Sequence, residues 1–500
     1  MEKYDLCVIG AGPAGYAGAM RALDFGKSVI LIEKDKVGGA GIYNGALSSK
    51  STWEFAKKIN NVTKEIKHLS DKAYDVTFTE VKEVVNAAIG ERKNQLEGHI
   101  KLLEEKYNEQ QFRFVKGYAF LKTKNQVVIQ TEKGEEIIDA KYILVATGSK
   151  PRKLNNIPID EKIIMTSDGL MNLTEFPKSL VILGAGVIGC EYATMFANFG
   201  KTQVNIIDKA ERILPFEDED VVKIIASNFE KNGVVIHHSC SLKRMEIIDG
   251  QVEYELLHQD GSAEICRVEK ALVSVGRIPN SKGLGLEEIG VRMDKEGYLL
   301  DFDTQTTIPN IFVAGDLCGR VCLVNVGELE AREAVKRMFG KSVPMRYDII
   351  SNIMFLNPEV ACIGMNEKQL QEKGIPYKMV KIDFSCIVRA IAMRKTQGFF
   401  KIMVTDDEEM RVLGMRALGV HASTAILAIA LIIANNQSIR ALGELTYPHP
   451  SIIEGLQECV RMILNKSIFK PDLFKDKLVI YRCANGVCTP IESLVEISAR

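Results

Sequence analysis

Apolar runs alternate with helix-like segments along the chain, and one such arrangement occurs twice. Residues 6–10 read LCVIG, and residues 179–184 read SLVILG. Each run is followed by a segment with apolar residues at helical spacing, and then by a second apolar run that ends in an acid. A strand, a helix and a second strand in this order form a βαβ unit, whose two strands lie parallel in one sheet. The pattern therefore predicts two βαβ units.

Glycines mark the turn of each unit: Gly10, Gly12 and Gly15 in the first, and Gly184, Gly186 and Gly189 in the second. The first glycine permits a tight turn, the second lets the backbone approach a pyrophosphate at the helix N-terminus, and the third lets helix and strand pack closely. Glu33 and Asp208 end the second strands, where a carboxylate accepts ribose hydroxyls. Two complete fingerprints imply that the chain binds two dinucleotides. Asp208 repels a 2′-phosphate and so favours NAD(H) over NADP(H), but Lys209 and Arg212 lie nearby and leave this choice open.

The polar segment at residues 52–110 is rich in Lys and Glu and has a helical period, so we expect a solvated pair of helices there. Further strands are expected at 112–121, 126–131 and 141–149, the last of which ends in the sequence ATGS. Another apolar strand ends at Gly315 and Asp316. An acid after such a turn either binds a ribityl hydroxyl or caps a helix, and both roles fit here.

Beyond Pro344 the pattern changes. Strand-like runs at 352–364, 399–405 and 411–419 precede helices at 421–436 and 451–464. This arrangement is typical of an α+β domain. A Lys-rich linker follows Leu464, and the chain then ends in the tail LVIYRCANGVCTPIESLVEISAR.

Composition narrows the classes of function. The 500 residues are 46% hydrophobic and 26% charged, with a formal net charge of −1, which points to no nucleic-acid or membrane partner. The longest apolar run, near residues 425–434, is shorter than the roughly 20 residues that span a bilayer. The first strand begins close to the N-terminus, so we expect no leader and a cytoplasmic protein. No cluster of metal-ligating residues stands out, and we expect no metal.

Residues 38–50 read GGAGIYNGALSSK, a stretch of small residues in which Lys50 is the only charge. Small residues let a backbone approach a flat ligand closely. A helix is expected to start at Ser48 or Ser49. The stretch contains no cysteine.

Together with the motifs VGRIPN, FVAGD, FLNPEVACIG, RAIAMRKTQGFFKI and HPSIIE, these segments resemble the flavoprotein disulfide reductases, and among them most closely the dihydrolipoamide dehydrogenases. The resemblance runs from about residue 4 to residue 465. It implies an α/β fold with two Rossmann-like dinucleotide-binding domains, for FAD and NAD, and an α+β C-terminal dimerisation domain. It also implies bound FAD and NAD(H) and a homodimer. The expected domains are FAD-binding (1–150 and 276–345), NAD-binding (151–275) and dimerisation (346–466), followed by a C-terminal extension (467–500).

The resemblance also assigns site residues. Lys50 matches a lysine beside the flavin and Glu191 its ion-pair partner, while His449 and Glu454 match a catalytic dyad. A cation near a flavin stabilises the negative charge that the ring gains on reduction. The implied cofactor-binding residues are Gly10, Gly12, Gly15, Glu33, Gly39, Lys50, Thr147, Gly148, Gly184, Gly186, Gly189, Asp208, Gly276, Arg277, Gly315 and Asp316.

One feature of that family is missing. Its members carry a redox disulfide in a Cys-x4-Cys pattern, and aligning the flanking GG and SK places Gly41 and Ala46 at the two cysteine positions. Neither residue can form a thiolate or a mixed disulfide. The sequence therefore predicts that dihydrolipoamide chemistry is lost.

Three hypotheses for the electron route remain open. In the first, NADH reduces FAD, which passes the electrons directly to a pyridine nucleotide, a quinone or a similar acceptor. In the second, Cys483 and Cys488, which have the Cys-x4-Cys spacing and an Asn-Gly turn between them, form a redox pair in the tail. In the third, the protein is a non-catalytic FAD-binding dimer.

Overall fold

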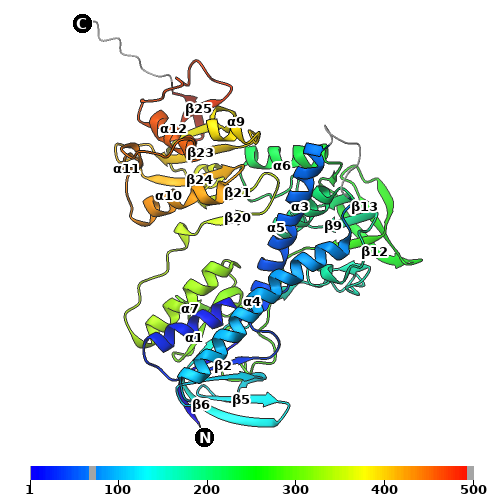
Figure 1. Ribbon diagram of the computed structural model, residues 1–500, viewed down its shortest axis with the longest axis vertical. Helices are drawn as coiled ribbons and strands as arrows, with labels where there is room; N and C mark the ends of the chain where they lie inside the picture. Colours follow the sequence, from blue (N-terminus) through cyan, green and yellow to red (C-terminus); the bar gives the residue numbers. More distant parts are fainter. Residues whose placement is uncertain (1, 67–74, 492–500) are drawn as a thin grey trace. The chain divides into compact units, whose positions relative to one another are not determined.

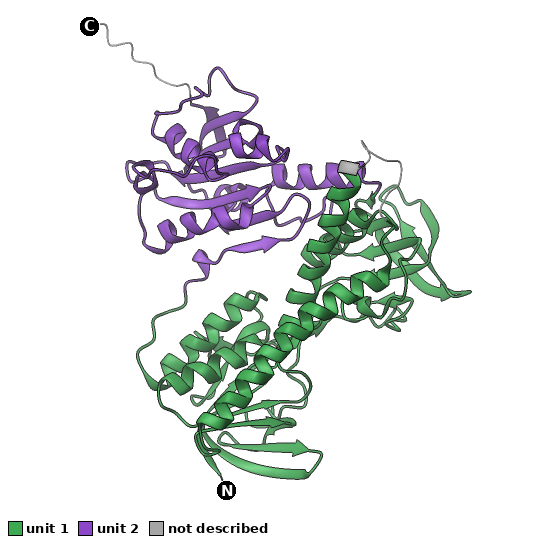
Figure 2. Ribbon diagram, viewed as in Figure 1, with its two compact units in different colours: residues 1–209, 234–345 green, residues 210–233, 346–500 purple. Residues whose placement is uncertain are grey.

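The computed structural model describes residues 2–66 and 75–491, which divide into two compact units (Figure 2). One unit comprises Met1–Lys209 and Val234–Met345, and the other comprises Ala210–Gly233 and Arg346–Arg500. Over the described ranges, no helix is long and apolar enough to cross a membrane. The same ranges contain no group of three or more His, Cys, Asp or Glu side chains placed to hold a metal ion.

The first unit is built on a nine-stranded sheet (Figure 1). At its centre, β1 (Lys3–Ile9) pairs in parallel with β2 (Val29–Glu33), and α1 (Pro13–Asp24) connects them, as the first βαβ unit predicts. Helix α7 (Val324–Phe339) packs beside α1, and their small residues Ala19, Ala22, Ala331 and Ala334 are fully buried. The other strands are β3 (Phe112–Lys116), β4 (Tyr118–Leu121), β5 (Gln126–Thr131), β6 (Gly134–Val145), β17 (Asp301–Phe302), β18 (Gln305–Thr306) and β19 (Ile311–Val313).

The second βαβ unit is also confirmed and lies in a five-stranded sheet of the same unit. Strands β9 (Ser179–Leu183) and β10 (Gln203–Ile207) are parallel and are connected by α5 (Val187–Phe199). The sheet is completed by β8 (Ile164–Met165), β11 (Val235–His237) and β15 (Lys270–Val273). A three-stranded antiparallel sheet follows, of β12 (Ser241–Ile248), β13 (Gln251–Leu257) and β14 (Ala263–Val268). The short strands β7 (Ser149–Pro151) and β16 (Arg277–Pro279) pair with each other.

The expected helical pair is present as α3 (Ala46–Ile66) and α4 (Phe78–Lys106), while residues 67–74 of that range lie outside the described part. Helix α3 begins at Ala46, so the prediction of a start at Ser48 or Ser49 was wrong. The Ser49 hydroxyl donates to the carbonyl of Gly45 at 2.5 Å, and that of Ser48 lies 3.5 Å from the same oxygen. Serines inside a helix bond back to the preceding turn in this way, whereas an N-cap accepts from the turn that follows.

The second unit has one seven-stranded antiparallel sheet, of β20 (Asn352–Met354), β21 (Val360–Gly364), β22 (Tyr377–Asp383), β23 (Phe399–Thr405), β24 (Val412–Leu418), β25 (Leu478–Ala484) and β26 (Val487–Pro490). Its helices are α6 (Glu219–Lys231), α8 (Glu367–Glu372), α9 (Val388–Ala392), α10 (Ala422–Ala434), α11 (Arg440–Gly443) and α12 (Glu454–Ile463). Residues 467–500 were expected to form a separate C-terminal extension. In the structure, β25 pairs along its length with β22, while residues 492–500 lie outside the described part.

Buried ion pairs fasten the segment Ala210–Gly233 within this second unit. Lys401 on β23 is only 2% exposed, and its Nζ lies 3.1 Å from Asp218 Oδ2 and 3.2 Å from Asp220 Oδ1. It also contacts the carboxylate of Glu367. Arg416 on β24 is buried as well, and its Nε donates to Glu217 at 2.6 Å. A buried charge is tolerated only when it is paired and hydrogen-bonded, so these contacts hold the segment in place.

Candidate active site

The first glycine turn has the geometry that the fingerprint requires. Gly10 has φ +102°, and a Cβ there would lie 2.5 Å from the carbonyl oxygen of Ala146. A Cβ on Gly15 would lie 1.8 Å from the carbonyl oxygen of Gly10, so neither position accepts a side chain. Gly12 is different, because a Cβ there would meet no atom within 4 Å. Its backbone therefore faces open space at the start of α1, where a pyrophosphate fits.

The second turn repeats this division of roles. A Cβ on Gly184 (φ +104°) would lie 2.7 Å from Ser274 O, and one on Gly189 would lie 2.0 Å from Gly184 O, while Gly186 faces open space. The terminal acids also match, since Glu33 Oε2 accepts from the amide of Ala11 at 2.7 Å and Asp208 Oδ2 accepts from Ala185 at 2.5 Å. The residues present therefore fit two dinucleotides.

Three predicted cofactor-binding stretches converge in the first unit. Arg277 Nε donates to the Ser149 hydroxyl at 2.7 Å, and that hydroxyl donates to Asp316 at 2.5 Å. Thr147 donates to the carbonyl of Asn280 at 2.8 Å, which joins the ATGS and VGRIPN stretches a second time. Ser149 and Asn280 were absent from the predicted site set, although both belong to motifs that marked it. Gly148, Gly276 and Gly315 all have positive φ, which explains the glycines at these turns.

Lys50 and Glu191 form an ion pair between α3 and α5. Lys50 Nζ lies 2.9 Å from Glu191 Oε2, and the side chains are 30% and 7% exposed. A carboxylate this buried needs a partner, and the contact fixes the direction in which the ammonium points. The predicted pair is therefore present in the structure, and its catalytic role remains a prediction.

The stretch from Gly38 to Lys50 lies beside a cavity. Gly39 and Gly41 belong to the short helix α2 (Gly39–Ile42), and Ala46 is the first residue of α3. Gly41 and Ala46 both line a cavity of about 640 Å³, together with Pro13 and Tyr16 of α1. A Cβ on Gly41 would lie 2.6 Å from the Pro13 ring, so this position has no room for a side chain. The two positions that the family alignment assigns to cysteine thus face a space that a small molecule can enter.

The polar lining of this cavity comes from three helices: Arg21 and Asp24 on α1, Glu91, Arg92 and Gln95 on α4, and Glu328 and Arg332 on α7. These residues were not among the expected site residues. Their positions are far apart in the chain, and each is also an ordinary residue for a solvated helix face.

His449 and Glu454 also meet as predicted, in the second unit. His449 Nδ1 lies 2.7 Å from Glu454 Oε1, and the amide of Ser451 donates to the other carboxylate oxygen at 2.9 Å. Burial alone would raise the pKa of Glu454, but the hydrogen bonds from Ser451 and His449 lower it. The carboxylate therefore orients an imidazole that is 66% exposed.

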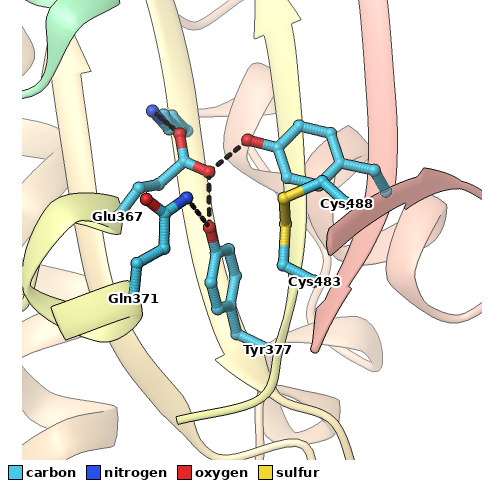
Figure 3. The surroundings of a disulfide bond; sticks show 7 residues. Glu367, Gln371, Tyr377, Cys483 and Cys488 are labelled. Atoms are coloured by element: carbon cyan, nitrogen blue, oxygen red, sulfur yellow. Dashed lines mark hydrogen bonds and ion pairs between the residues drawn. A yellow bond between two sulfur atoms is a disulfide. The ribbon is translucent and has the colours of Figure 1, made fainter. Parts of the chain in front are cut away.

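Cys483 and Cys488 form a disulfide across the hairpin of β25 and β26. Cys483 is buried and Cys488 is exposed. Figure 3 shows the bond beside Tyr377 and Glu367, where the Tyr377 hydroxyl donates to Glu367 at 2.9 Å. Tyr481, on β25, contacts the same carboxylate. The disulfide thus joins a strand that is anchored in the sheet to the strand at its edge.

Two large apolar side chains are exposed on α10. Leu427 and Leu431 lie one turn apart on this helix, and both are exposed. Exposed large apolar residues gathered on one face mark interaction surfaces.

Comparison with known proteins identifies the domains. Residues 4–333 match the model of the pyridine nucleotide-disulphide oxidoreductases, and residues 350–460 match the dimerisation domain of the same family. The dimerisation domain supports the predicted homodimer.

Among curated proteins, the chain is 32% identical to a dihydrolipoyl dehydrogenase of Bacillus subtilis over 457 residues, covering 91% of the chain and 97% of that protein. It is 31% identical to dihydrolipoyl dehydrogenase 3 of Pseudomonas putida over 464 residues, covering 92% and 97%.

Solved structures agree. A copper(II) complex of the HOCl-induced flavoprotein disulfide reductase RclA from Escherichia coli superposes with a TM-score of 0.81 at 26% identity, covering 93% of this chain and all of that one. LpdA of Mycobacterium tuberculosis superposes with a TM-score of 0.83 at 23% identity over the same share of this chain, which supports the fold. Enzymes of this kind bind FAD and NAD(H). The chain therefore belongs to the flavoprotein disulfide reductase family, as an FAD-dependent pyridine nucleotide oxidoreductase close to the dihydrolipoamide dehydrogenases.

Proposed function

We propose that this enzyme transfers electrons from NADH by way of FAD directly to a small acceptor in the cavity beside Gly41 and Ala46, without an N-terminal disulfide. Bound FAD supplies the hydride chemistry that links the two substrates. The observation that carries the proposal is that both positions face the cavity and neither has a sulfur atom. Because a side chain at Gly41 would meet the Pro13 ring, the acceptor occupies the cavity beside the two positions and not the place of a cysteine side chain.

The chain supplies the remaining parts of the reaction. Gly12 and Gly186 leave room for the two pyrophosphates, and Glu33 and Asp208, each hydrogen-bonded to its glycine turn, are the proposed ribose ligands. Glu191 holds the Lys50 ammonium in one direction, so that positive charge is in place before negative charge develops beside it. We propose that His449, oriented by Glu454, donates or accepts a proton at the acceptor site of the second subunit of the homodimer.

The cavity lining bears on the acceptor. Three arginines and three carboxylates line it, so its formal charges balance, while the rest of the lining is mostly apolar. The charged side chains favour an acceptor that carries polar groups of its own, because charges buried against hydrocarbon without partners cost free energy.

The two other hypotheses fit less well. The tail disulfide is joined to a strand that pairs with β22 over six residues, from Tyr377 to Ile382, which opposes movement of the tail as a free arm. A non-catalytic dimer would not need an oriented Lys50–Glu191 pair or a second complete fingerprint. Both features are present.

Filling the cavity should separate the two half-reactions. In Ala46→Phe, we expect steady-state turnover with NADH and a water-soluble benzoquinone to fall about 10²-fold, because the acceptor is displaced from its reacting position. Flavin reduction by NADH in a stopped-flow experiment should stay within about twofold of the parent rate. Ala87→Phe is the matched control, since Ala87 is exposed on α4 and does not line the cavity. Unchanged quinone turnover in Ala46→Phe would contradict the proposal.

A further inference from the structure

A second cluster of reactive side chains lies in the first unit, apart from the cavity. The connection from β11 to β12 carries Cys240, the turn from β13 to β14 carries His258, and Glu264 is on β14. Cys240 Sγ lies 3.2 Å from His258 Nδ1, and His258 Nε2 lies 3.3 Å from Glu264 Oε2. These three residues bring a thiol, an imidazole and a carboxylate into one hydrogen-bonded row.

One tautomer of the His258 imidazole is compatible with both of its hydrogen bonds. When Nε2 carries the proton it donates to Glu264, and Nδ1 can then accept the thiol proton of Cys240, for which the His238 carbonyl oxygen, also at 3.2 Å, is the other acceptor. A nucleophile within reach of a base, with the base oriented by a third group, is the arrangement that activates a thiol for attack.

The surroundings of Cys240 favour its protonated thiol, so a reaction at its sulfur requires a base. Burial raises the pKa of the Cys240 thiol, and the carboxylates of Glu264 and Asp260 raise it further. The group is therefore a protonated thiol at neutral pH and needs a proton acceptor before it can react. Although Cys240 is only 3% exposed, the ring beside it is 31% exposed, so the thiol lies directly beneath the surface.

The backbone connects this thiol to the second nucleotide fingerprint. The amide of Cys240 donates to the carbonyl of Asp208 at 3.3 Å, and the amide of Asp208 donates to the carbonyl of His237 at the same distance. Asp208 is the acid proposed above to bind the ribose of NAD(H). A change in the size or charge of the Cys240 side chain would therefore shift the backbone that positions the Asp208 carboxylate.

We propose that Cys240 is a modification site for small electrophiles, hydrogen peroxide among them, and that its modification weakens NAD(H) binding. The second half of this inference rests on the proposed role of Asp208. In the reaction with peroxide, Cys240 Sγ attacks one peroxide oxygen, so an S–O bond forms and the O–O bond breaks. The thiol proton passes through His258 Nδ1 to the departing hydroxide and gives water. The sulfur is oxidised to a sulfenic acid by two electrons, and the peroxide is reduced by two.

Labelling of the FAD-loaded protein tests the reactivity without any turnover assay. With limiting iodoacetamide, peptide mass spectrometry should find Cys240 labelled faster than Cys266, a thiol on β14 whose sulfur lies 3.4 Å from Glu264. In His258→Gln, labelling of Cys240 should fall about 10²-fold because the general base is lost. Glu264→Gln, which keeps the imidazole, should show a smaller loss and serves as the second variant if His258→Gln fails to fold. Equal labelling of the two cysteines, or a rate indifferent to these variants, would overturn the assignment.

The link to the nucleotide is tested separately. After brief peroxide treatment, the KM for NADH should rise while FAD content stays constant, and in Cys240→Ser the same treatment should leave the KM unchanged. An unchanged KM in the treated parent protein, with Cys240 shown to be oxidised, would overturn the coupling. Neither result depends on the Ala46→Phe experiment. The proposed acceptor site could therefore be disproved while the proposal for Cys240 stands, and the reverse.

Discussion

Replacing Lys50 by Met should slow flavin reduction by NADH about 10²- to 10³-fold while FAD stays bound, which is the usual loss when a preorganised charge donor is removed. Lys50 is held at 2.9 Å by a carboxylate that is almost completely buried, so its charge needs no reorganisation when the reaction begins. Methionine keeps the length and apolar packing of the lysine stem and removes only the charge. Stopped-flow absorbance at the flavin band measures the rate, and the FAD to protein ratio measures retention.

Two variants separate this role from a structural one. Lys58→Met changes an exposed lysine on the same helix and should leave the rate unaltered. Glu191→Gln keeps the ammonium but weakens its orientation, so we expect a smaller loss, of about tenfold. If Lys50→Met reduced flavin at the parent rate, the ion pair would have to be assigned to stability alone.

The second large effect is on stability and concerns Lys401. Lys401→Met should lower the free energy of unfolding of the second unit by about 3–5 kcal/mol, the usual result of removing one partner from a buried ion pair. The variant leaves Asp218, which is as buried as the lysine, and Asp220 without their shared cation. Equilibrium urea unfolding followed by circular dichroism measures the change.

Lys378→Met provides the matched control. Its Nζ lies 3.6 Å from Asp406 and it is 24% exposed, and the buried Asp406 keeps Arg482 as a partner when the lysine is removed, so breaking this pair should cost no more than about 1 kcal/mol. Adding Asp218→Asn to Lys401→Met should recover part of the loss, because one unpaired charge is removed. A loss in Lys401→Met as small as in the control would show that the cluster does not fasten the segment from Ala210 to Gly233.

The dinucleotide-binding units could be predicted from the sequence because their signals are local. A glycine turn, a helix and a terminal acid fall within some 30 residues, and each has a steric cause that the structure displays at Gly10 and Gly184. The contact between Lys50 and Glu191, in contrast, has no local signal in the sequence. The two residues lie 141 positions apart, and only resemblance to a family placed them together.

Other features depend on pairings that no local pattern encodes. The tail strand β25 could not be recognised as part of a sheet, since its partner β22 precedes it by about a hundred residues. Lys401 lies in the run FFKIMVT, where a lone charge is usually a solvated position, and its burial follows from carboxylates in distant segments. The row of Cys240, His258 and Glu264 forms only when two β-connections meet, so none of these residues stood out in the sequence.

Anaerobic titration with NADH shows whether electrons from NADH reach any redox centre other than the flavin. If the flavin is the only redox centre that NADH reaches, one NADH per FAD should bleach the flavin completely, with no long-wavelength thiolate band. The Cys483→Ser/Cys488→Ser variant should give the same end point as the parent enzyme. Uptake of a second NADH per FAD, whether with a thiolate band or only when the tail disulfide is intact, would show that the electrons leave through sulfur and would contradict the account.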